Sequence, residues 1–432
     1  MTFDEAVRYL LSLGHETLAL KLGLNTTEVL LRALGDPQTA YAAVQIAGTN
    51  GKGSTAVTLD SICRAAEIRT GLFTSPHLTS ITERIRIDGA DISREAFAQF
   101  ATTVRERIED LIEAGELAAP PTFFEQVTAI ALLAFKESKI KLAILETGLG
   151  GRLDSTTVAR ADTVGITPIS IDHQEYLGET LAEIAAEKAA IIRPGVNAVI
   201  APQDPIALDV VMKACRSSGV TPRLVSDDAM RANSTSDGRL QLTFQSSQDT
   251  YEKVWMGLRG RHQVINVSLA IELAESLRER GFAIPHQAIV EGIERVRHPG
   301  RLELLERHPP IVLDGAHNPA GARALRAYLD EFVTQPITLI FGGMRDKQLT
   351  EMMRVLFPRA RRIVLTEPRN IRAASASMLQ QYAAELNSAW TVIVEPSSKK
   401  AIDLAIESSG ATDLVCITGS LYLVGEVRDR LK

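Results

Sequence analysis

The segment GTNGKGST, residues 48–55, has the residue types of a loop that binds nucleotide phosphate. Its glycines let backbone N–H groups approach anionic oxygens without an intervening side chain. Lys52 can reach the β- and γ-phosphates, and a hydroxyl of Ser54 or Thr55 can face Mg²⁺. The spacing departs from the common phosphate loop, because two residues instead of four separate Gly48 from the next Gly-Lys pair. The alternative is an ordinary glycine-rich turn.

The flanking segments favour phosphate binding over that alternative. Residues 43–47 are an apolar run that predicts a buried strand, and residues 56–63 predict the start of a helix. A glycine-rich turn between a strand and a helix N-terminus offers both N–H groups and a partial positive charge to an anion. The predicted nucleotide-binding residues of this loop are Gly48, Thr49, Asn50, Gly51, Lys52, Gly53, Ser54 and Thr55.

Acidic and imidazole side chains follow two further predicted strands. The apolar run 141–146 ends in Glu146, and His173 comes shortly after a strand at 161–167. Ligands of open parallel sheets lie beyond the carboxyl ends of the strands, so Glu146 is a candidate Mg²⁺ ligand, with a turn-capping carboxylate as the alternative. His173 suits Mn²⁺ better than Mg²⁺, or is a capping or core histidine. Asp154 is open between a helix cap and a ligand.

Three other segments have polar residues whose pattern alone indicates structural roles. Lys188 lies in a predicted helix near 180–192, where a solvated lysine is the ordinary interpretation. Residues 74–78 form a loop after a strand. Thr122 predicts the N-cap of a helix whose first residues are Phe123 and Phe124, and an aromatic pair at such a place is more typical of a core.

A second α/β series follows residue 300 and predicts a doubly wound domain of about 130 residues. Polar residues follow its strands at 314–319, 342–347 and 418–420, which suggests that one sheet edge faces a ligand. Asn318 can instead be the N-cap of the helix opened by Pro319. The predicted strands are 311–314, 337–341, 362–366, 391–394 and 414–418.

Length and alternation predict the domain organisation. A chain of 432 residues with alternating strands and helices predicts an α/β protein with parallel sheets and two or three domains. Residues 295–301 look like a linker, and residues 226–250 look like a surface hairpin region with one strand at 240–244. Residues 1–14 predict an amphipathic helix without the basic start of a signal peptide.

Composition excludes several classes of function. The net charge of −6 gives no basic signature for nucleic acid or for an anionic membrane surface. No apolar run approaches the roughly 18 residues of a membrane span. Cys63, Cys215 and Cys416 are scattered in apolar runs, which predicts buried free thiols and fits a reducing cytoplasm.

Ten motifs in order resemble the folylpolyglutamate synthase/dihydrofolate synthase family, relatives of the Mur peptidoglycan ligases. The resemblance covers essentially the whole chain and implies a Mur-ligase-like P-loop ATPase domain, residues 1–297, followed by a Rossmann-like α/β glutamate-ligase domain, residues 298–432, with the active site between them. One departure is His298, where the family often has arginine before PGRLE. The motifs are GTNGKGS (48–54), SPHL (75–78), FFE (123–125), ETGLGGRLDST (146–156), DHQEYLG (172–178), EKA (187–189), HQVIN (262–266), PGRLE (299–303), DGAHNP (314–319) and GSLYLVGEV (419–427).

The resemblance also implies roles for individual residues. Lys188 matches a lysine that is carbamylated in such ligases and lies near a second Mg²⁺ ion, which reverses the interpretation from pattern. The implied catalytic residues are Lys52, Lys188 and His317, the metal ligands Ser54, Glu146 and His173, the further ATP contacts Asn266, Arg301 and Asp314, and the substrate contacts Ser75, His77, Phe124, Glu125, His317 and Ser420.

The implied activity is an ATP-dependent amide ligase that adds L-glutamate to folates, and to dihydropteroate, through an acyl phosphate. Domain closure would exclude water from that intermediate. The implied ligands are ATP, one or two Mg²⁺ ions, L-glutamate and a folate, without nucleic acid or membrane partners, in a cytoplasmic monomer.

Three alternatives are weaker. A Mur-type peptidoglycan-precursor ligase carries an additional N-terminal domain, and 47 residues before Gly48 are too few for one. A non-catalytic nucleotide-binding regulator would be expected to lose the phosphate lysine or the metal carboxylate, and both are present. An NAD-dependent dehydrogenase would need a GxGxxG turn after a strand, which no strand of the C-terminal half provides.

Overall fold

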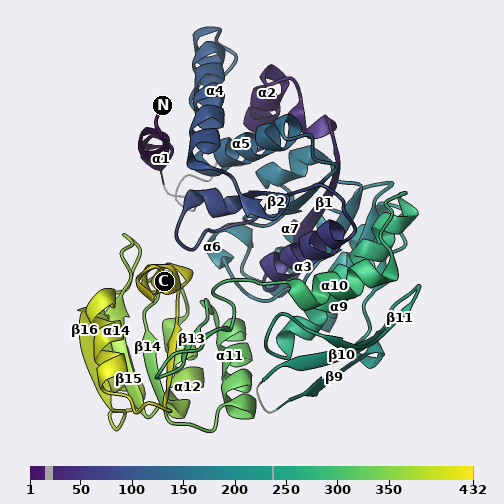
Figure 1. The fold of residues 1–432 in the computed structure, drawn as a ribbon. Helices are drawn as coiled ribbons and strands as arrows, with labels where there is room; N and C mark the ends of the chain where they lie inside the picture. Colours follow the sequence, from purple (N-terminus) through teal and green to yellow (C-terminus); the bar gives the residue numbers. More distant parts are fainter. Residues whose placement is uncertain (15–22, 236–237, 432) are drawn as a thin grey trace. The chain divides into compact units, whose positions relative to one another are not determined.

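The computed structural model describes residues 1–14, 23–235 and 238–431. The chain divides into two compact units. Unit 1 comprises residues 1–231, 243–254 and 265–296, and unit 2 comprises residues 232–242, 255–264 and 297–432. Each unit contains a sheet flanked by helices (Figure 1). The predicted α/β fold class, with predominantly parallel sheets, is confirmed.

Unit 1 is built on an eight-stranded sheet in the order β4-β3-β2-β5-β1-β6-β7-β8. The strands from β2 to β8 in this order are parallel, and β3 and β4 join as an antiparallel edge. The strands are β1 Ala42–Ala47, β2 Thr70–Phe73, β3 Ile85–Ile87, β4 Ala90–Asp91, β5 Leu142–Glu146, β6 Thr163–Ile166, β7 Asn197–Ile200 and β8 Arg223–Leu224.

The central strands are apolar along most of their length because helices cover both faces of a parallel sheet. On one face, α10 approaches α3 closely enough that a Cβ on Gly292 would lie 2.4 Å from the Ile62 Cα. The helices of unit 1 are α1 Phe3–Ser12, α2 Asn25–Ala33, α3 Lys52–Ala65, α4 Arg94–Glu113, α5 Phe123–Glu137, α6 Gln174–Leu177, α7 Leu181–Ala189, α8 Pro205–Ser217, α9 His262–Glu279 and α10 His286–Arg295.

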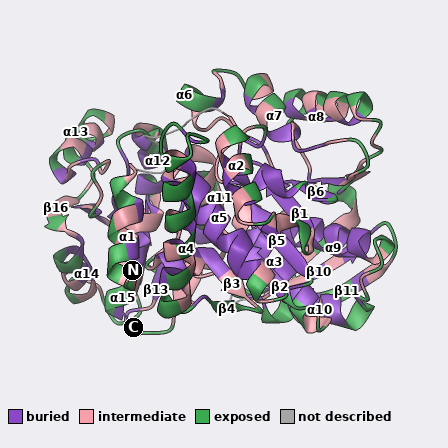
Figure 2. Ribbon diagram, turned by 90° about the horizontal axis from the view of Figure 1, so that it is seen from above, coloured by how far each residue is buried: buried purple, intermediate pink, exposed green. Residues whose placement is uncertain are grey.

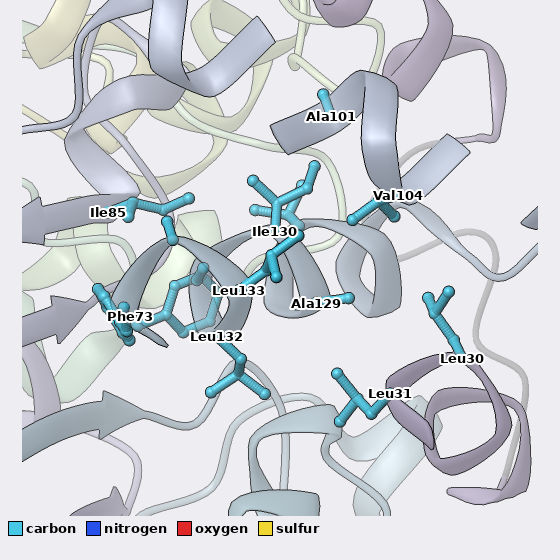
Figure 3. Close-up of a cluster of buried hydrophobic side chains, with 14 of the residues drawn as sticks. Leu30, Leu31, Phe73, Ile85, Ala101, Val104, Ala129, Ile130, Leu132 and Leu133 are labelled. Carbon is cyan, nitrogen blue, oxygen red and sulfur yellow. The ribbon is translucent and has the colours of Figure 1, made fainter. Parts of the chain in front are cut away.

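A large cluster of buried side chains in unit 1 surrounds α5. Figure 3 shows Ile130 and Leu133 of α5 between Phe73 of β2, Ile85 of β3 and the α2 helix. In Figure 2, buried residues are concentrated in β1, β5 and α5, and exposed residues lie along α4 and α8. The predicted N-terminal amphipathic helix is confirmed as α1, which buries Ala6 and Leu10.

Residues 230–255 form a three-stranded sheet in the order β11-β10-β9. The strands are β9 Met230–Ser234, β10 Leu240–Gln245 and β11 Thr250–Trp255. The prediction of a hairpin region with a single strand at 240–244 was therefore wrong for the two flanking strands. β9 has no buried residue, and β11 buries Tyr251 and Val254, which are three residues apart, because Lys253 has a φ of 53°. β11 therefore lacks the two-residue alternation that marks a half-buried strand.

Unit 2 contains a six-stranded sheet in the order β12-β13-β17-β14-β15-β16. All neighbouring strands are parallel except β12, which pairs antiparallel with β13. The five strands predicted from the sequence are present. The elements are β12 Glu303–Leu305, β13 Ile311–Leu313, β14 Ile337–Phe341, β15 Arg362–Glu367, β16 Val392–Ser397, β17 Leu414–Thr418, α11 Pro319–Phe332, α12 Leu349–Leu356, α13 Ala376–Leu386, α14 Ser398–Glu407 and α15 Leu421–Leu431.

Two general expectations can be compared with the described residues. The three cysteines are buried and unpaired, as predicted. No helix in the described part of the chain is both long enough and apolar enough to cross a membrane.

Candidate active site

The predicted phosphate loop follows β1 and leads into α3, whose N-cap is Gly51. Gly48 and Gly51 have φ values of 146° and 92°, which side chains rarely adopt. A Cβ on Gly48 would lie 1.9 Å from the Thr167 Oγ1, and one on Gly51 would lie 2.1 Å from the Asn266 Oδ1. Both positions therefore require glycine. Asn266, a predicted ATP contact on α9, thus lies directly beside the loop.

The loop is held by the segment that follows β6. The backbone N–H groups of Thr49 and Asn50 both donate to the Pro168 carbonyl, at 3.1 and 3.2 Å. The Thr49 hydroxyl donates to the Ser170 carbonyl, and the Asn50 side-chain amide donates to the Ser170 hydroxyl, both at 3.0 Å. These bonds fix the backbone of the loop without using Lys52 or Ser54.

Two lysines converge on one backbone oxygen of the loop. The Lys52 Nζ lies 3.2 Å from the Gly48 carbonyl and 3.3 Å from the Thr49 carbonyl. The Lys188 Nζ, from α7, lies 2.9 Å from the same Gly48 carbonyl. Lys188 is buried, so the pattern-based interpretation of a solvated helix lysine was wrong. Burial, followed by repulsion from Lys52, lowers the pKa of Lys188 to about 7.

Glu146 lies at the same sheet edge as the phosphate loop. It is the last residue of β5, and it pairs with Ile46 near the end of β1. Its carboxylate is buried and accepts a hydrogen bond from the Ser75 backbone N–H at 3.1 Å. Ser75 follows β2, which pairs with β5 in parallel. The carboxyl ends of β1, β2, β5 and β6 therefore bring the predicted phosphate, metal and substrate loops of unit 1 to one edge.

The donors at this edge fit a magnesium ion that is held partly by other ligands. Among residues 1–14, 23–235 and 238–431, no three or more His, Cys, Asp or Glu side chains are grouped to hold a metal. Mg²⁺ usually takes only one or two carboxylates and completes its shell with water and phosphate oxygens. Glu146 can supply such a carboxylate, and the hydroxyl of Ser54, in the first turn of α3, can supply a further oxygen ligand. His173 is the N-cap of α6 and has a φ of 53°.

Asp154, which the sequence left open between cap and ligand, is a cap. Its Oδ1 accepts from the backbone N–H and the hydroxyl of Thr156, at 3.0 and 2.5 Å. Its Oδ2 accepts from the backbone N–H groups of Gly148 and Leu149, at 2.8 and 2.9 Å. Burial raises the pKa of Asp154, and these four hydrogen bonds oppose that shift.

The predicted substrate residues of unit 1 divide into two kinds. The Phe124 ring is half-buried and lies against Gly148, where a Cβ would be 2.5 Å from the ring Cζ. Glu125 is buried, and its carboxylate accepts from the Thr122 N–H at 2.7 Å and from the Thr27 hydroxyl at 3.1 Å. Glu125 thus completes the helix cap of α5, and its contact with substrate stays a prediction.

His77 has a partner that the sequence did not indicate. Its Nδ1 accepts a hydrogen bond from the Arg84 Nε at 2.8 Å. The Arg84 side chain is buried and its guanidinium lies over the Phe123 ring, 5.4 Å from the centroid. Because an Nδ1 that accepts leaves the proton on Nε2, this bond sets the imidazole tautomer. Arg84 is seven residues after His77, and no sequence pattern predicts a hydrogen bond at that separation.

In unit 2, the predicted nucleotide contacts Arg301 and Asp314 lie in neighbouring loops. Asp314 follows β13, and its buried carboxylate accepts from the Leu302 N–H and the Ala316 N–H, each at 3.0 Å. The Arg301 guanidinium donates to the Gly315 carbonyl at 3.2 Å. Burial raises the pKa of Asp314, and the charge of Arg301 opposes that shift. Arg301 also contributes, after burial, to lowering the pKa of His262 to about 4.

The remaining predicted residues of unit 2 belong to the same sheet edge. The His317 Nδ1 lies 2.9 Å from the Gly315 carbonyl oxygen. The Asn318 Oδ1 accepts from the Gly321 N–H at 2.8 Å, so Asn318 is the N-cap of α11, as its alternative interpretation held. Ser420 follows β17 and accepts from the Tyr422 N–H at 3.1 Å.

Comparison with known proteins settles the family. The Mur ligase middle domain matches residues 46–274, and the Mur ligase glutamate ligase domain matches residues 300–421. A Bacillus subtilis dihydrofolate synthase/folylpolyglutamate synthase is 35% identical over 425 residues, which cover 97% of each chain. The chain belongs to the folylpolyglutamate synthase/dihydrofolate synthase family of Mur ligases.

Solved structures of the family agree with this fold. Mycobacterium tuberculosis folylpolyglutamate synthase complexed with ADP superposes with a TM-score of 0.92 at 30% identity, covering 99% of this chain and 98% of the other. Escherichia coli FolC in complex with DHPP and ADP superposes with a TM-score of 0.87 at 27% identity, covering 100% and 98%. The family resemblance drawn from ten motifs is therefore confirmed.

Proposed function

We propose that the protein is an ATP-dependent ligase that joins L-glutamate to folates and also to dihydropteroate. The observation that carries this proposal is the edge of unit 1, where Lys52, Lys188 and Glu146 lie around a phosphate-type loop. The kinship with synthases of both names, over nearly the full length of the chain, supplies the substrate class. Two cations on one loop carbonyl suit a polyanion such as ATP.

The reaction proceeds through an acyl phosphate. A carboxylate oxygen of the folate attacks the γ-phosphorus, the bond to the bridging oxygen of ADP breaks, and an acyl phosphate forms. The amine of L-glutamate then attacks the acyl carbon, a proton leaves the nitrogen, and the C–O bond to phosphate breaks. The products are an amide, ADP and inorganic phosphate.

Residues of unit 1 act on the phosphoryl group. Lys52 leaves the two loop carbonyls and moves its ammonium onto the β- and γ-phosphate oxygens, where it offsets charge in the transition state. Ser54, Glu146 and His173 would hold Mg²⁺, with the rest of its shell left to phosphate oxygens and water. When bound, the metal neutralises the phosphates and orients the γ-phosphoryl group.

Lys188 is suited to carbamylation. Carbamate formation needs the neutral amine, and a pKa of about 7 supplies that form at neutral pH. The neutral amine nitrogen attacks CO₂ and loses one proton, which turns a buried neutral amine into an anionic carbamate. That anion lies beside Lys52 and can help to hold a second Mg²⁺ ion.

The other assigned residues bind the remaining groups. Asn266, Arg301 and Asp314 contact ATP. His317 binds the incoming glutamate, and Ser420 is a further substrate contact. Phe124 and Glu125 bind the pterin end of the folate, and Ser75 and His77 are further substrate contacts. We place the domain division between residues 297 and 298. We expect a cytoplasmic monomer without nucleic-acid or membrane partners. Analytical ultracentrifugation would test whether the protein is a monomer.

Product analysis by mass spectrometry tests the proposal. Purified protein receives ATP, Mg²⁺ and L-glutamate with either 7,8-dihydropteroate or tetrahydrofolate. We expect a mass increase of one glutamyl residue with both substrates. Addition to one substrate alone would narrow the activity to a single synthase. ATP binding without extension of either substrate would contradict the proposed function.

A further inference from the structure

One feature at the carboxyl edge of unit 1 has no part in the reaction above, namely a side chain that continues the pairing of β6 with β7. Just beyond these two strands, the Ala201 N–H donates to the Ile166 carbonyl at 2.9 Å. Pro202 follows, and a proline has no N–H with which to extend the ladder. The backbone on the β7 side therefore cannot continue the pairing through residue 202.

Gln203 replaces the missing backbone groups with its side-chain amide. Its Nε2 donates to the Thr167 carbonyl at 3.0 Å, and its Oε1 accepts from the Ile169 N–H at 2.9 Å. A primary amide has both the donor and the acceptor of a peptide group, so this one side chain holds two backbone groups at once. The side chain is half-buried, which limits the access of competing water to both bonds.

The segment held in this way, residues 167–170, is the one that fixes the phosphate loop. The Pro168 carbonyl accepts from the N–H groups of Thr49 and Asn50. The Ser170 N–H donates to the Thr49 Oγ1 at 3.1 Å, and the Thr49 hydroxyl donates to the Ser170 carbonyl at 3.0 Å. These two residues therefore form a reciprocal pair, and a shift of the segment moves the loop directly.

The start of the phosphate loop is packed against the same segment. Thr167 is fully buried, and its N–H donates to the Ala47 carbonyl at 2.8 Å. Its Oγ1 would lie 1.9 Å from a Cβ on Gly48, so the loop has no clearance on the β6 side. A displacement of Thr167, whose carbonyl is held by Gln203, must therefore be passed on to Gly48.

We propose that Gln203 is a positioning residue for the nucleotide, which holds residues 167–170 so that the phosphate loop keeps the backbone conformation that binds ATP. The inference rests on the proposed function, since it takes residues 48–55 as the ATP site. Its effect should be selective for the nucleotide. The folate should be spared because Phe124 packs against β2 and against the loop after β5, away from this clamp.

The test compares nucleotide binding, steady-state kinetics and thermal unfolding in three variants. Gln203→Met keeps the length of the side chain and removes both hydrogen bonds. Ser170→Ala removes only the hydroxyl that accepts from the Asn50 side-chain amide. Gln245→Met is the matched control, because Gln245, at the end of β10, also donates to a backbone carbonyl and accepts from a hydroxyl, at 3.3 and 2.6 Å.

Titration calorimetry with ADP measures the nucleotide affinity. For Gln203→Met we expect the Kd for ADP and the KM for ATP to rise about fivefold or more, with the folate KM changed less than about twofold. Ser170→Ala should raise both nucleotide constants about two- to threefold, because the backbone bonds of the segment remain. Gln245→Met should leave all of these constants unchanged.

A merely structural role for Gln203 would lower the unfolding temperature and leave the Kd for ADP of the folded protein at the parent value, and that result would overturn the inference. Equal rises in the nucleotide and folate constants would also overturn it, because they would indicate a general loosening of the fold. If Gln203→Met does not fold, Ser170→Ala decides, and an unchanged Kd for ADP there contradicts the inference.

Failure of the proposed function would look different. The calorimetry uses ADP alone and needs no pterin substrate. A parent protein that binds ADP but extends neither pterin substrate would defeat the proposed function, whereas the role of Gln203 would still be decided by the Kd values of the variants.

Discussion

The two strand-end regions of this molecule use polar side chains in opposite ways. In unit 1, the groups at the sheet edge come from distant parts of the chain, and Lys188 reaches the Gly48 carbonyl across 140 residues. In unit 2, most of the polar groups at the sheet edge form hydrogen bonds with N–H groups of the loops in which they lie. Asp314 binds N–H groups of adjoining loops, and Asn318 caps the helix that it precedes.

In unit 1 two lysines converge on one loop carbonyl, whereas in unit 2 side chains hydrogen-bond the N–H groups of their own loops. Two ammonium groups on one carbonyl repel each other, and this repulsion contributes to the lowered pKa of Lys188. The Asp314 carboxylate, by contrast, is matched to two buried N–H groups. We therefore expect substitutions in unit 1 to change catalysis more than stability, and substitutions at Asp314 or Asn318 to change stability first.

The largest effect should come from Lys52→Ala. Because Lys52 would offset charge on the transferred phosphoryl group, we expect kcat/KM to fall about a hundred- to a thousandfold. Removing the Lys52 ammonium relieves its repulsion of Lys188, so the unfolding temperature of the variant should match that of the parent protein. Lys136→Ala is the matched control, because Lys136 also donates to a backbone carbonyl, that of Gly35 at 3.1 Å, at an exposed site. Normal turnover by Lys52→Ala would contradict the comparison.

The pH dependence of Lys188 gives the next effect. With a pKa of about 7, the amine is largely protonated at pH 6, so carbamate-dependent activity should be about tenfold lower at pH 6 than at pH 8. Added bicarbonate at pH 7 should raise the rate. An activity that stays constant across pH 6–8, with and without bicarbonate, would contradict carbamylation of Lys188.

The same lysine also changes stability with pH. Its pKa is lowered from 10.5 to about 7, so between these values the folded protein holds fewer protons than the unfolded chain. The free energy of unfolding contributed by this group should therefore rise with pH across that window. Lys188→Met should flatten this rise in urea titrations, and an unaltered slope would show that Lys188 titrates normally.

Asp314→Ala should mainly destabilise unit 2. It leaves the buried N–H groups of Leu302 and Ala316 without an acceptor, for a loss of about 2–4 kcal/mol in the free energy of unfolding. Asp413→Ala is the control, because Asp413 accepts from the Gly410 N–H at a more exposed site and should cost at most about 1 kcal/mol. Equal losses in the two variants would argue against the structural role of Asp314.

The smallest effect should come from Asn318→Ala. Loss of an N-cap typically costs about 1 kcal/mol, and glutamate binding by His317 should change little if Asn318 only shapes the loop. Chemical denaturation together with the KM for glutamate checks both statements. A large rise in that KM with unchanged stability would make Asn318 a ligand-binding residue.

The sequence predicted the phosphate loop well because its chemistry is local. Glycines at fixed positions, a strand before them and a helix after them are all within one segment. β1 lies where that pattern put it, and α3 begins at Lys52, four residues before the predicted start at 56. The parallel sheets followed from the alternation of apolar strands and helices. The strand-end position of Glu146 followed in the same way.

What the sequence could not predict depends on contacts between distant segments. The burial of Lys188 follows from the packing of α7 near the loop, whereas its neighbours in sequence are those of a surface helix. The two carboxylate oxygens of Asp154 accept hydrogen bonds from two different segments. The residue type alone does not show whether an aspartate caps such segments or binds a ligand. β11 was missed because a positive φ at Lys253 breaks the alternation of buried residues.

Isotope transfer tests the central claim most directly. The folate substrate is labelled with ¹⁸O in the carboxylate that receives glutamate, and the inorganic phosphate released during turnover is analysed by mass spectrometry. Ligation through an acyl phosphate predicts one ¹⁸O atom in each phosphate formed from fully labelled substrate, because the C–O bond breaks while the O–P bond stays. Phosphate without the label, formed alongside the glutamylated product, would contradict this account.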